Sequence, residues 1–478
     1  MRYDRRVATY HVENFGCRAT QADGAALERQ FESRGLNAAS AAQADLVILN
    51  TCTVTNSADQ DARAAIRRVQ RQNPLAKIIV TGCYAQRAPQ EIAALPGVTA
   101  VIGNSHKHQL AEIVIEETTR LNTSFLPLSA LTEKGELRTE NRVFVSDIFA
   151  HTELQAAPVF ESANHESGNH ESGRTRPNLK VQDGCDNRCS FCIIPSVRGQ
   201  SRSLPFAQVI GEMNALVDAG YREVVISGIN LGRWGRDLER GESRQPDFEH
   251  LLRTILLETK LEKLRISSVE PMDWTDELID MVAYSPRIAK HAHVPLQSGS
   301  DAVLRRMHRK YRPWHYREKI EKIRAAMPTG AIGADVMAGF PGETDAEFEA
   351  TRRLIAELPF TYLHVFTYSA RPGTPAADLP NQVPVHVARE RNKILRDLAA
   401  EKKLAFMQSF IGKPLDAITL NVTHNNSDGE FTEALTDNYQ KLYLRGCHEP
   451  NRWITAQIKG VQDGVFVADL FPTISPTN

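Results

Sequence analysis

Strand-like and helix-like segments alternate along most of this chain, and that alternation limits the folds open to it. Near the start, short apolar runs such as Leu46–Leu49 and Lys77–Val80 flank an amphipathic stretch, Ala58–Gln72. Repeated strand–helix–strand order predicts a parallel sheet covered by helices. We therefore expect an α/β protein whose N-terminal domain is an open parallel sheet.

The same alternation resumes further along the chain and then gives way to a different pattern. Residues 178–407 contain six strand-like segments separated by helical ones, which predicts a partial (β/α)6 barrel with its site at the C-terminal strand ends. From residue 408, short strand-like runs and turn residues predict a small antiparallel β-barrel of OB-like type. Residues 121–177 include a polar tandem repeat at 164–173, which is typical of a connecting segment and linker.

Composition excludes several classes of protein. The 478 residues carry 57 Lys and Arg against 58 Asp and Glu, so the chain is no uniformly basic nucleic-acid coat. No run approaches the roughly 18 apolar residues of a membrane span, and the N-terminus lacks a signal-like apolar core. The odd count of 7 cysteines disfavours a secreted disulfide scaffold. We expect a cytoplasmic protein without membrane contact, whose reduced thiols are available to bind metal.

Three widely spaced cysteines share one structural context. Cys17, Cys52 and Cys83 each lie a few residues beyond the end of a predicted strand. Because the carboxyl ends of parallel strands meet at one edge of a sheet, these thiols are expected to converge on one ligand site. The alternative is that they are three unrelated buried or reactive thiols.

Three other cysteines are close together in the sequence. Cys185, Cys189 and Cys192 have the spacing C-x3-C-x2-C after a strand-like segment. Three thiolates on one loop can ligate three irons of a [4Fe–4S] cluster and leave the fourth iron open for reactivity. A structural zinc site is the alternative, but it needs a fourth ligand, and no Cys or His follows in a familiar zinc spacing. Cys447 stands alone, and we predict no function for it.

These residues also carry a resemblance to a known family. Residues 185–192 resemble the radical S-adenosylmethionine (SAM) motif, and the chain from about residue 7 to 472 resembles the radical SAM methylthiotransferases. Matching segments include Asn50–Cys52, Thr81–Cys83, Cys192–Pro195, Arg265–Pro271, Pro295–Ser300 and Gly339–Thr344. The resemblance implies a methylthiotransferase domain (1–120), a linker (121–177), a radical SAM core (178–407) and a TRAM domain (408–478).

The resemblance implies a chemistry as well. Two [4Fe–4S] clusters and SAM would be the cofactors, with an electron donor and a sulfur source as further partners. The cluster at Cys185, Cys189 and Cys192 would bind SAM and cleave it to a 5′-deoxyadenosyl radical. The auxiliary cluster at Cys17, Cys52 and Cys83 would carry the sulfur that a second SAM methylates. No catalytic residues beyond the cluster ligands are predicted.

Residues at the predicted strand ends of the core are candidates for holding SAM. Small and polar side chains there suit the amino group and ribose of SAM, although small residues at strand ends also simply make turns. The candidates are Ser227, Gly228, Ser268, Glu270, Gln297, Ser298 and Gly339.

The resemblance also indicates a substrate. Segments 50–56 and 81–86 resemble the branch that converts N6-threonylcarbamoyladenosine next to the tRNA anticodon to its 2-methylthio derivative. Within the family, the alternatives are N6-isopentenyladenosine in tRNA and an aspartate of a ribosomal protein. Outside it, the alternative is a non-catalytic Fe–S or RNA-binding protein.

Charge patterning supports an RNA partner. Residues 301–324 carry nine Lys and Arg and three acidic residues, with aromatic residues between them. Lys and Arg neutralise phosphates and aromatic rings stack on unpaired bases, so this segment is a candidate RNA surface. The candidate residues are Arg305, Arg306, Arg309, Lys310, Arg312, Tyr311 and Trp314. The C-terminal barrel is net acidic, so a role for it in tRNA binding rests on the resemblance. The sequence does not indicate the oligomeric state, and a monomer is assumed.

Overall fold

The structure is a computed structural model that describes residues 9–123, 142–150, 175–239, 246–426 and 429–471. The chain divides into two compact units. The first comprises residues 1–159, 183–202 and 369–374, and the second comprises 160–182, 203–368 and 375–478. Most of the predicted linker, including the tandem repeat at 164–173, lies outside the described residues.

The first unit is built on a six-stranded parallel sheet with the order β2-β1-β3-β4-β5-β6. Its strands are β1 (Thr9–Asn14), β2 (Asn37–Ala38), β3 (Leu46–Thr51), β4 (Lys77–Gly82), β5 (Val98–Gly103) and β6 (Arg142–Phe144). The predicted open parallel sheet is therefore confirmed.

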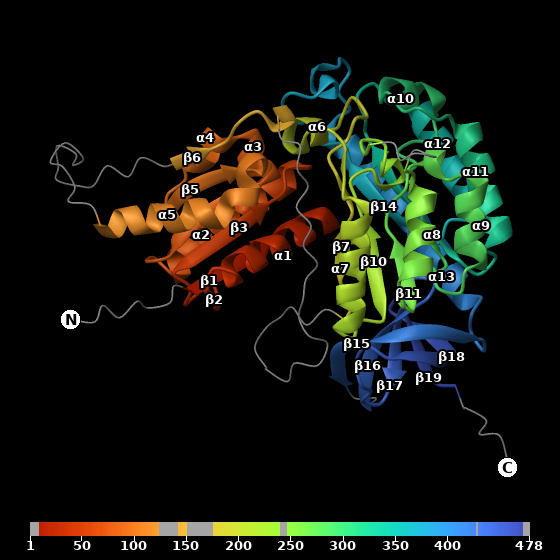
Figure 1. The fold of residues 1–478 in the computed structure, drawn as a ribbon. Helices are drawn as coiled ribbons and strands as arrows, with labels where there is room; N and C mark the ends of the chain where they lie inside the picture. The colour runs from red at the N-terminus through yellow and green to blue at the C-terminus, as the bar shows by residue number, and fades with distance from the viewer. Residues whose placement is uncertain (1–8, 124–141, 151–174, 240–245, 427–428, 472–478) are drawn as a thin grey trace, which may run out of the picture. The chain divides into compact units, whose positions relative to one another are not determined.

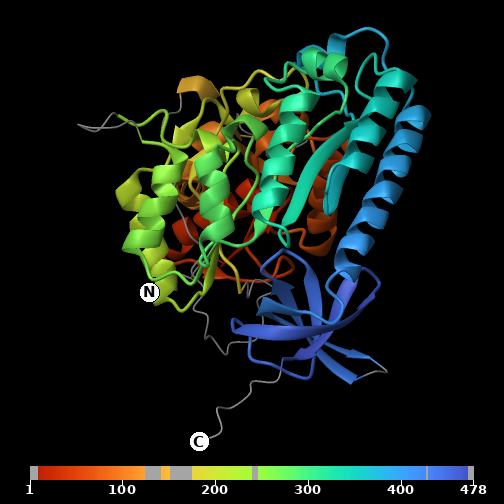
Figure 2. The ribbon, with the colours of Figure 1, turned by 90° about the vertical axis from the view of Figure 1, so that its right-hand side faces the viewer.

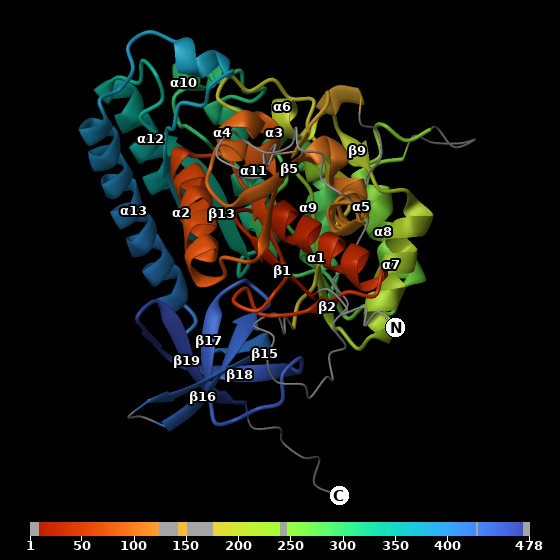
Figure 3. The same cartoon turned by 90° about the vertical axis from the view of Figure 1, so that its left-hand side faces the viewer.

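Helices cover both faces of this sheet (Figures 1 and 3). They are α1 (Arg18–Glu32), α2 (Asn56–Gln72), α3 (Cys83–Arg87), α4 (Pro89–Ala93) and α5 (Leu110–Thr123). Along β3, Leu46 and Ile48 face α1 and α5, whereas Val47 and Leu49 face α2, α3 and α4. All six residues of β3 are buried, and its first four, Leu46–Leu49, supply apolar side chains to both faces, as a covered parallel sheet requires.

The second unit contains two three-stranded parallel sheets with the orders β7-β10-β11 and β12-β13-β14. Isolated bridges from Leu264 to Ile288 and from Ser268 to His293 join them into one curved, six-stranded wall. The strands are β7 (Asn178–Lys180), β10 (Glu223–Ser227), β11 (Lys263–Ile266), β12 (His291–His293), β13 (Ala331–Ala338) and β14 (Tyr362–Thr367). The predicted partial barrel of six strands is confirmed.

Helices form the outer layer of this wall (Figure 2). They are α7 (Phe206–Asp218), α8 (Phe248–Glu258), α9 (Asp276–Tyr284), α10 (Asp301–Arg306), α11 (Pro313–Ala326), α12 (Asp345–Glu357) and the long α13 (Val385–Gln408). Helix α12 begins with a capping box between Thr344 and Glu347, which fixes the chain where it leaves β13.

Helix α13 leads into a closed five-stranded barrel with the order β15-β16-β17-β19-β18 (Figure 2). Its strands are β15 (Pro414–Asn426), β16 (Gly429–Thr436), β17 (Lys441–Arg445), β18 (Trp453–Gln462) and β19 (Val465–Leu470). Four neighbouring pairs are antiparallel, as predicted, but β17 and β19 run parallel. The parallel pair arises because β18 crosses over to pair with β15, and the following hairpin then brings β19 back beside β17.

Candidate functional site

The first unit brings Cys17, Cys52 and Cys83 to one edge of its sheet. Cys17 is the N-cap residue of α1, just beyond β1, Cys52 directly follows β3, and Cys83 is the first residue of α3 after β4. Strands β1, β3 and β4 are consecutive neighbours in the sheet. Three cysteines separated by tens of residues therefore lie at adjacent strand ends, because the strands run parallel.

Two glycines make this approach possible. Gly16 has a φ of +108°, and a Cβ placed on it would lie 3.0 Å from the Sγ of Cys52. Gly82 has a φ of +97°, and a Cβ on it would lie 2.3 Å from the carbonyl oxygen of Thr51. Both backbone shapes favour glycine, and a side chain would fill the space that brings the neighbouring cysteines together.

The surroundings of the three thiols suit metal ligands. Burial, and then the neighbouring Cys83, raises the pKa of Cys52 to about 12 in the metal-free protein. The Sγ of Cys52 accepts a hydrogen bond from the Val54 amide at 3.5 Å, and the Sγ of Cys83 accepts one from Asn104 Nδ2 at 3.6 Å. Hydrogen bonds from N–H groups to sulfur are characteristic of Fe–S sites.

Within the described residues, no three Cys, His, Asp or Glu side chains are placed to hold a single metal ion. A [4Fe–4S] cluster does not need such a point, because each thiolate binds a different iron. The edge of three thiols is closely approached at Gly16 and Gly82, and its three cysteines are the residues that would hold such a cluster.

The second cysteine group lies on a loop of the same unit. The amide of Cys185 bonds to Gly199 O at 3.1 Å, and the amide of Cys192 bonds to Cys189 O at 3.1 Å, so backbone hydrogen bonds shape the loop. The short helix α6 (Ile194–Arg198) follows it. Cys185 is buried, whereas Cys189 and Cys192 are partly exposed, and none of the seven cysteines is in a disulfide bond.

Helix α6 connects the two cysteine groups. Ile193 and Val197 pack against Cys83 in one buried cluster. Asn104 Nδ2 donates to the carbonyl oxygen of Val197 at 2.7 Å as well as contacting the Sγ of Cys83. The loop that carries the C-x3-C-x2-C motif is thus anchored on the edge formed by the other three cysteines.

A buried charged network borders the same edge, and the sequence reasoning missed it. Arg198, 2% exposed, donates to both oxygens of Asp183 at 3.0 Å and to Asp23 Oδ2 at 2.9 Å. Lys107 Nζ also donates to Asp23, at 3.1 Å. The only signal in the sequence was the position of Arg198, six residues beyond Cys192.

At the strand ends of the second unit, two hydroxyl groups are buried without a partner. Ser227 ends β10 and Ser267 directly follows β11, and neither Oγ has a hydrogen-bond partner in the described part of the chain. A Cβ on Gly228 would lie 2.8 Å from Gln182 Oε1, so the backbone is tightly approached there. Ser227 and Gly228 were predicted from the sequence, whereas Ser267 was missed beside the predicted Ser268. Buried donors without partners suit a polar ligand.

The remaining SAM candidates have contacts of their own. Glu270 forms an ion pair with Arg309, and Ser298 is buried with its Oγ 3.1 Å from that of Thr351. Gln297 adopts a φ of 62°, and its backbone pairs with that of Val336 in an isolated bridge.

Gly339 is packed against a helix of its own unit. A Cβ on it would lie 2.4 Å from the Cβ of Ala388 in α13. Packing of α13 therefore explains this glycine without a ligand.

The fold divides the predicted RNA-binding residues into exposed and buried sets. Arg305, Lys310 and Trp314 are exposed, the last at 56%. Tyr311 is 1% exposed and donates its hydroxyl to the carbonyl oxygens of Pro295 and Leu296. Tyr311 therefore packs inside the unit and is not a surface platform for a base.

Much of the positive charge of residues 301–324 is paired. Two of the cations pair with acidic residues from other segments: Arg306 with Glu347, and the buried Arg309 with Glu270. Arg312 and Arg305 both pair with Asp301. The excess of cations counted along the sequence is therefore partly neutralised by the fold.

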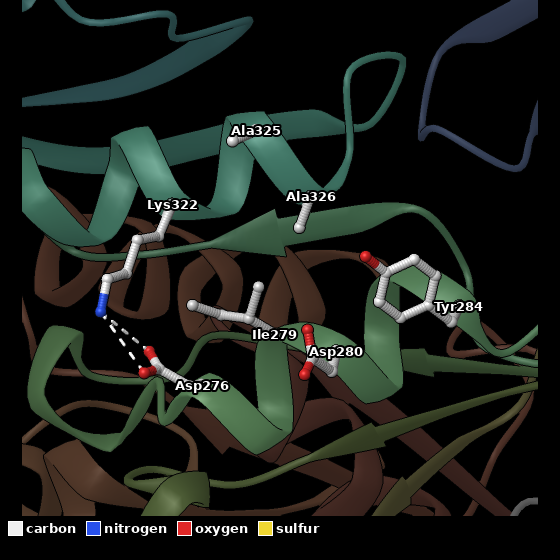
Figure 4. A pocket seen from close by; sticks show the side chains of 7 residues that line it. All are labelled: Asp276, Ile279, Asp280, Tyr284, Lys322, Ala325 and Ala326. Atoms are coloured by element: carbon white, nitrogen blue, oxygen red, sulfur yellow. Dashed lines mark hydrogen bonds and ion pairs between the residues drawn. The ribbon is translucent and has the colours of Figure 1, made fainter.

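A shallow pocket of about 360 Å³ lies between α9 and α11 in the outer helical layer (Figure 4). Asp276, Asp280, Tyr284 and Lys322 line it, together with small and apolar side chains. Two of these lining residues interact, since Lys322 Nζ donates to Asp276 Oδ1 at 3.1 Å. The pocket includes none of the cysteines or strand-end candidates, so it is separate from the predicted site.

Comparisons with known proteins agree with this geometry. Residues 9–103 match an uncharacterized protein family, UPF0004, and residues 179–355 match the Radical SAM superfamily. The chain is 36% identical to the threonylcarbamoyladenosine tRNA methylthiotransferase MtaB of Bacillus subtilis, over 93% of this chain and 92% of that protein. It is 34% identical to the tRNA-2-methylthio-N(6)-dimethylallyladenosine synthase of Novosphingobium aromaticivorans, over 86% of each chain.

Among solved structures, the fold is similar to that of TsrM, a radical SAM methyltransferase from Kitasatospora setae, with a TM-score of 0.55. The alignment covers 81% of this chain and 84% of that one at 14% identity, so it shows the fold alone.

The parallel-sheet unit with its cysteine edge, the partial barrel and the C-x3-C-x2-C loop define a radical SAM enzyme. The chain belongs to the radical SAM tRNA methylthiotransferase family. Its cofactors are [4Fe–4S] clusters and SAM, as predicted. No helix in the described residues is long and apolar enough to cross a membrane.

Proposed function

We propose that this enzyme converts N6-threonylcarbamoyladenosine next to the anticodon of tRNA to its 2-methylthio derivative, in the cytoplasm. The observation that carries the proposal is the identity of 33–36% to several proteins named threonylcarbamoyladenosine tRNA methylthiotransferase, each match covering at least 85% of this chain. A base in the anticodon loop is already unpaired, so it can enter a site at modest cost in stacking.

In this proposal the six cysteines divide between two clusters. Cys17, Cys52 and Cys83 hold the auxiliary cluster, and Cys185, Cys189 and Cys192 hold the cluster that binds SAM. When bound, these cofactors would supply the radical chemistry and the methyl group and would carry the sulfur. A sulfur source and an electron donor are the further partners.

The side chains of the second unit that we propose bind and orient SAM lie at its strand ends. The buried hydroxyls of Ser227 and Ser267 offer hydrogen bonds to the polar groups of SAM, and Gly228 keeps the backbone close. Glu270, held by Arg309, presents a fixed carboxylate to the ribose. Ser268, Gln297 and Ser298 remain candidates through their positions after β11 and β12, and Gly339 through its position after β13.

A second substrate has a specific observation in its favour. Relatives named tRNA-2-methylthio-N(6)-dimethylallyladenosine synthase are 34% identical over 85–86% of this chain. These values are close to those of the first group, so N6-isopentenyladenosine is the second candidate.

Nucleoside mass spectrometry of tRNA decides between the two. A strain lacking this protein should lose the 2-methylthio derivative of threonylcarbamoyladenosine, and the wild-type gene, but not the Cys185→Ala variant, should restore it. Loss of the 2-methylthio derivative of N6-isopentenyladenosine instead would establish the second candidate. Unchanged tRNA in the deletion strain would contradict both.

We propose that exposed cations of segment 301–324 contact tRNA phosphates. Arg305 and Lys310 are exposed, and Trp314 offers an exposed ring. Lys310→Ala should weaken tRNA binding and reduce the salt dependence of the binding constant by about one unit of slope for each lost phosphate contact. Tyr311→Phe is a matched control, because its ring is buried and its hydroxyl bonds to backbone carbonyls. An unchanged salt slope in Lys310→Ala would remove this residue from the interface.

A further inference from the structure

Arg198 ends α6, six residues beyond the last cysteine of the radical SAM motif, and it is almost completely buried. One terminal nitrogen bonds to Asp183 at 3.0 Å and the other to Asp23 at 2.9 Å. Lys107 supplies a second cation to Asp23 at 3.1 Å. Arg198 thus links the two carboxylates, and Lys107 adds a second cation at Asp23.

The third nitrogen of this guanidinium is unusual. Arg198 Nε is buried and has no hydrogen-bond partner within the described residues. Buried donors in native proteins are nearly always paired, so a buried N–H without a partner calls for a specific explanation, such as a group that binds there. The carboxylates of Asp183 and Asp23 occupy only the terminal nitrogens.

The cysteine edge is the nearest candidate for that group. Val197, adjacent to Arg198, packs against Cys83, and its carbonyl oxygen shares Asn104 Nδ2 with the Sγ of Cys83. Although burial alone lowers the pKa of Arg198, Asp183, Cys83, Asp23 and Cys17 together raise it well above its usual value. Arg198 directly follows Val197, which packs against Cys83, so the buried Nε–H lies on the segment that contacts the cysteine edge.

We propose that Arg198 is a positioning residue of the auxiliary site, which balances the negative charge of the cluster on Cys17, Cys52 and Cys83 and offers its Nε–H to a sulfur there. This inference rests on the proposed assignment of those three cysteines. It goes beyond that assignment because it links the reduction potential of the auxiliary cluster to a residue that follows the loop of the other cysteine group. The competing view is that Arg198 only neutralises Asp23 and Asp183.

The two views differ in their effect on a reduction potential. The potential of an Fe–S cluster depends on net charge and on hydrogen bonds to its sulfurs. Removal of a nearby cation and an N–H donor makes the reduced, more negative cluster harder to form, so the potential falls. Neutralisation of Asp23 should raise the reduction potential instead, because it removes a negative charge that offsets the positive charge of Arg198.

The experiment is a redox titration monitored by electron paramagnetic resonance on the full-length chain. Cys185, Cys189 and Cys192 are replaced by Ala together, so that only the auxiliary cluster contributes. On this background, Arg198→Met should shift the midpoint potential to more negative values, and Arg198→Lys should shift it less because the charge remains. Asp23→Asn should shift it to more positive values.

The outcomes separate the two claims. A triple-Ala background that binds no cluster would refute the cysteine assignment itself. Suppose instead that the background binds its cluster and that neither Arg198→Met nor Asp23→Asn changes its midpoint potential. This result would overturn the role of Arg198 and leave the cysteine assignment standing. Should Arg198→Met fail to retain iron, Arg198→Lys decides, because it keeps the charge and removes the Nε–H: a negative shift supports the proposal and an unchanged potential refutes it.

Discussion

The two cysteine groups of this enzyme are assembled in different ways. Cys185, Cys189 and Cys192 lie within eight residues of one another, on a loop shaped by its own backbone hydrogen bonds. Cys17, Cys52 and Cys83 come from three strand ends and meet only when β1, β3 and β4 pair in parallel. The first group is a local motif whose loop also packs on Cys83 through α6, whereas the second is a product of the fold, so damage to the sheet should affect the second group more than the first.

The largest expected effect is on the local group. Cys185→Ala removes one of three thiolates on a single loop, so SAM cleavage should fall to the level of a protein-free control. The measurement is 5′-deoxyadenosine formed with dithionite and SAM. Cys447→Ala is the matched control, because this exposed cysteine belongs to neither group, and it should retain wild-type cleavage. Wild-type cleavage by Cys185→Ala would contradict the assignment.

The next effect is on the metal content of the dispersed group. Cys52→Ala should lose one cluster and keep the other, so bound iron should fall by about four atoms per chain. Iron and sulfide analysis after anaerobic reconstitution measures this loss. An equal loss in Cys447→Ala would show that the effect is not specific to the ligand.

A change in the sheet tests the comparison without touching a ligand. Gly82→Ala would place a Cβ 2.3 Å from Thr51 O, in a backbone shape that only glycine adopts easily. We expect a loss of about 1–3 kcal/mol in the free energy of unfolding, together with loss of the auxiliary cluster but not of SAM cleavage.

Gly35→Ala is the matched control for this change. Gly35 also has a positive φ, of +80°, but a Cβ there meets nothing within 4 Å. Its cost should be limited to about 1 kcal/mol of backbone strain, with both clusters retained. Equal iron contents in the two variants would argue against a special role for the close approach at Gly82.

The smallest effect is a difference in reactivity within the dispersed group. In the metal-free protein, Cys17 is exposed, whereas Cys52 is 6% exposed and its pKa is raised to about 12 by burial and by Cys83. A raised pKa keeps the thiol protonated, so alkylation of Cys52 should stay slow at pH 9 and accelerate only as the pH approaches 12. Alkylation followed by peptide mass spectrometry measures both sites. Faster reaction of Cys52 than of Cys17 near pH 8 would contradict this placement.

The sequence predicted the framework well because the framework is periodic. The strand-like runs Leu46–Leu49 and Lys77–Val80 lie within β3 and β4, and the edge shared by the three cysteines follows from the rule that parallel strands end together. Strand β16 (Gly429–Thr436) was not predicted. Only six of its eight residues are buried, and several of those are polar, so its pattern is neither a clear alternation nor an apolar run.

Contacts between distant residues could not be predicted in the same way. Arg198 bonds to Asp23 across 175 positions, and nothing near Arg198 in the sequence indicates this partner. Tyr311 appeared to be a surface aromatic among cations, but the fold buries its ring and directs its hydroxyl to backbone carbonyls. Local spacing indicates which residues can bind a cluster, whereas packing decides which charges surround it.

The most direct test of the two-site account is one reaction of the reconstituted Cys52→Ala variant with SAM, dithionite and tRNA, analysed for both products. The account predicts that 5′-deoxyadenosine still forms while no methylthio nucleoside appears, because the local cluster remains and the dispersed one is lost. Methylthio product from this variant at the wild-type level would contradict the account.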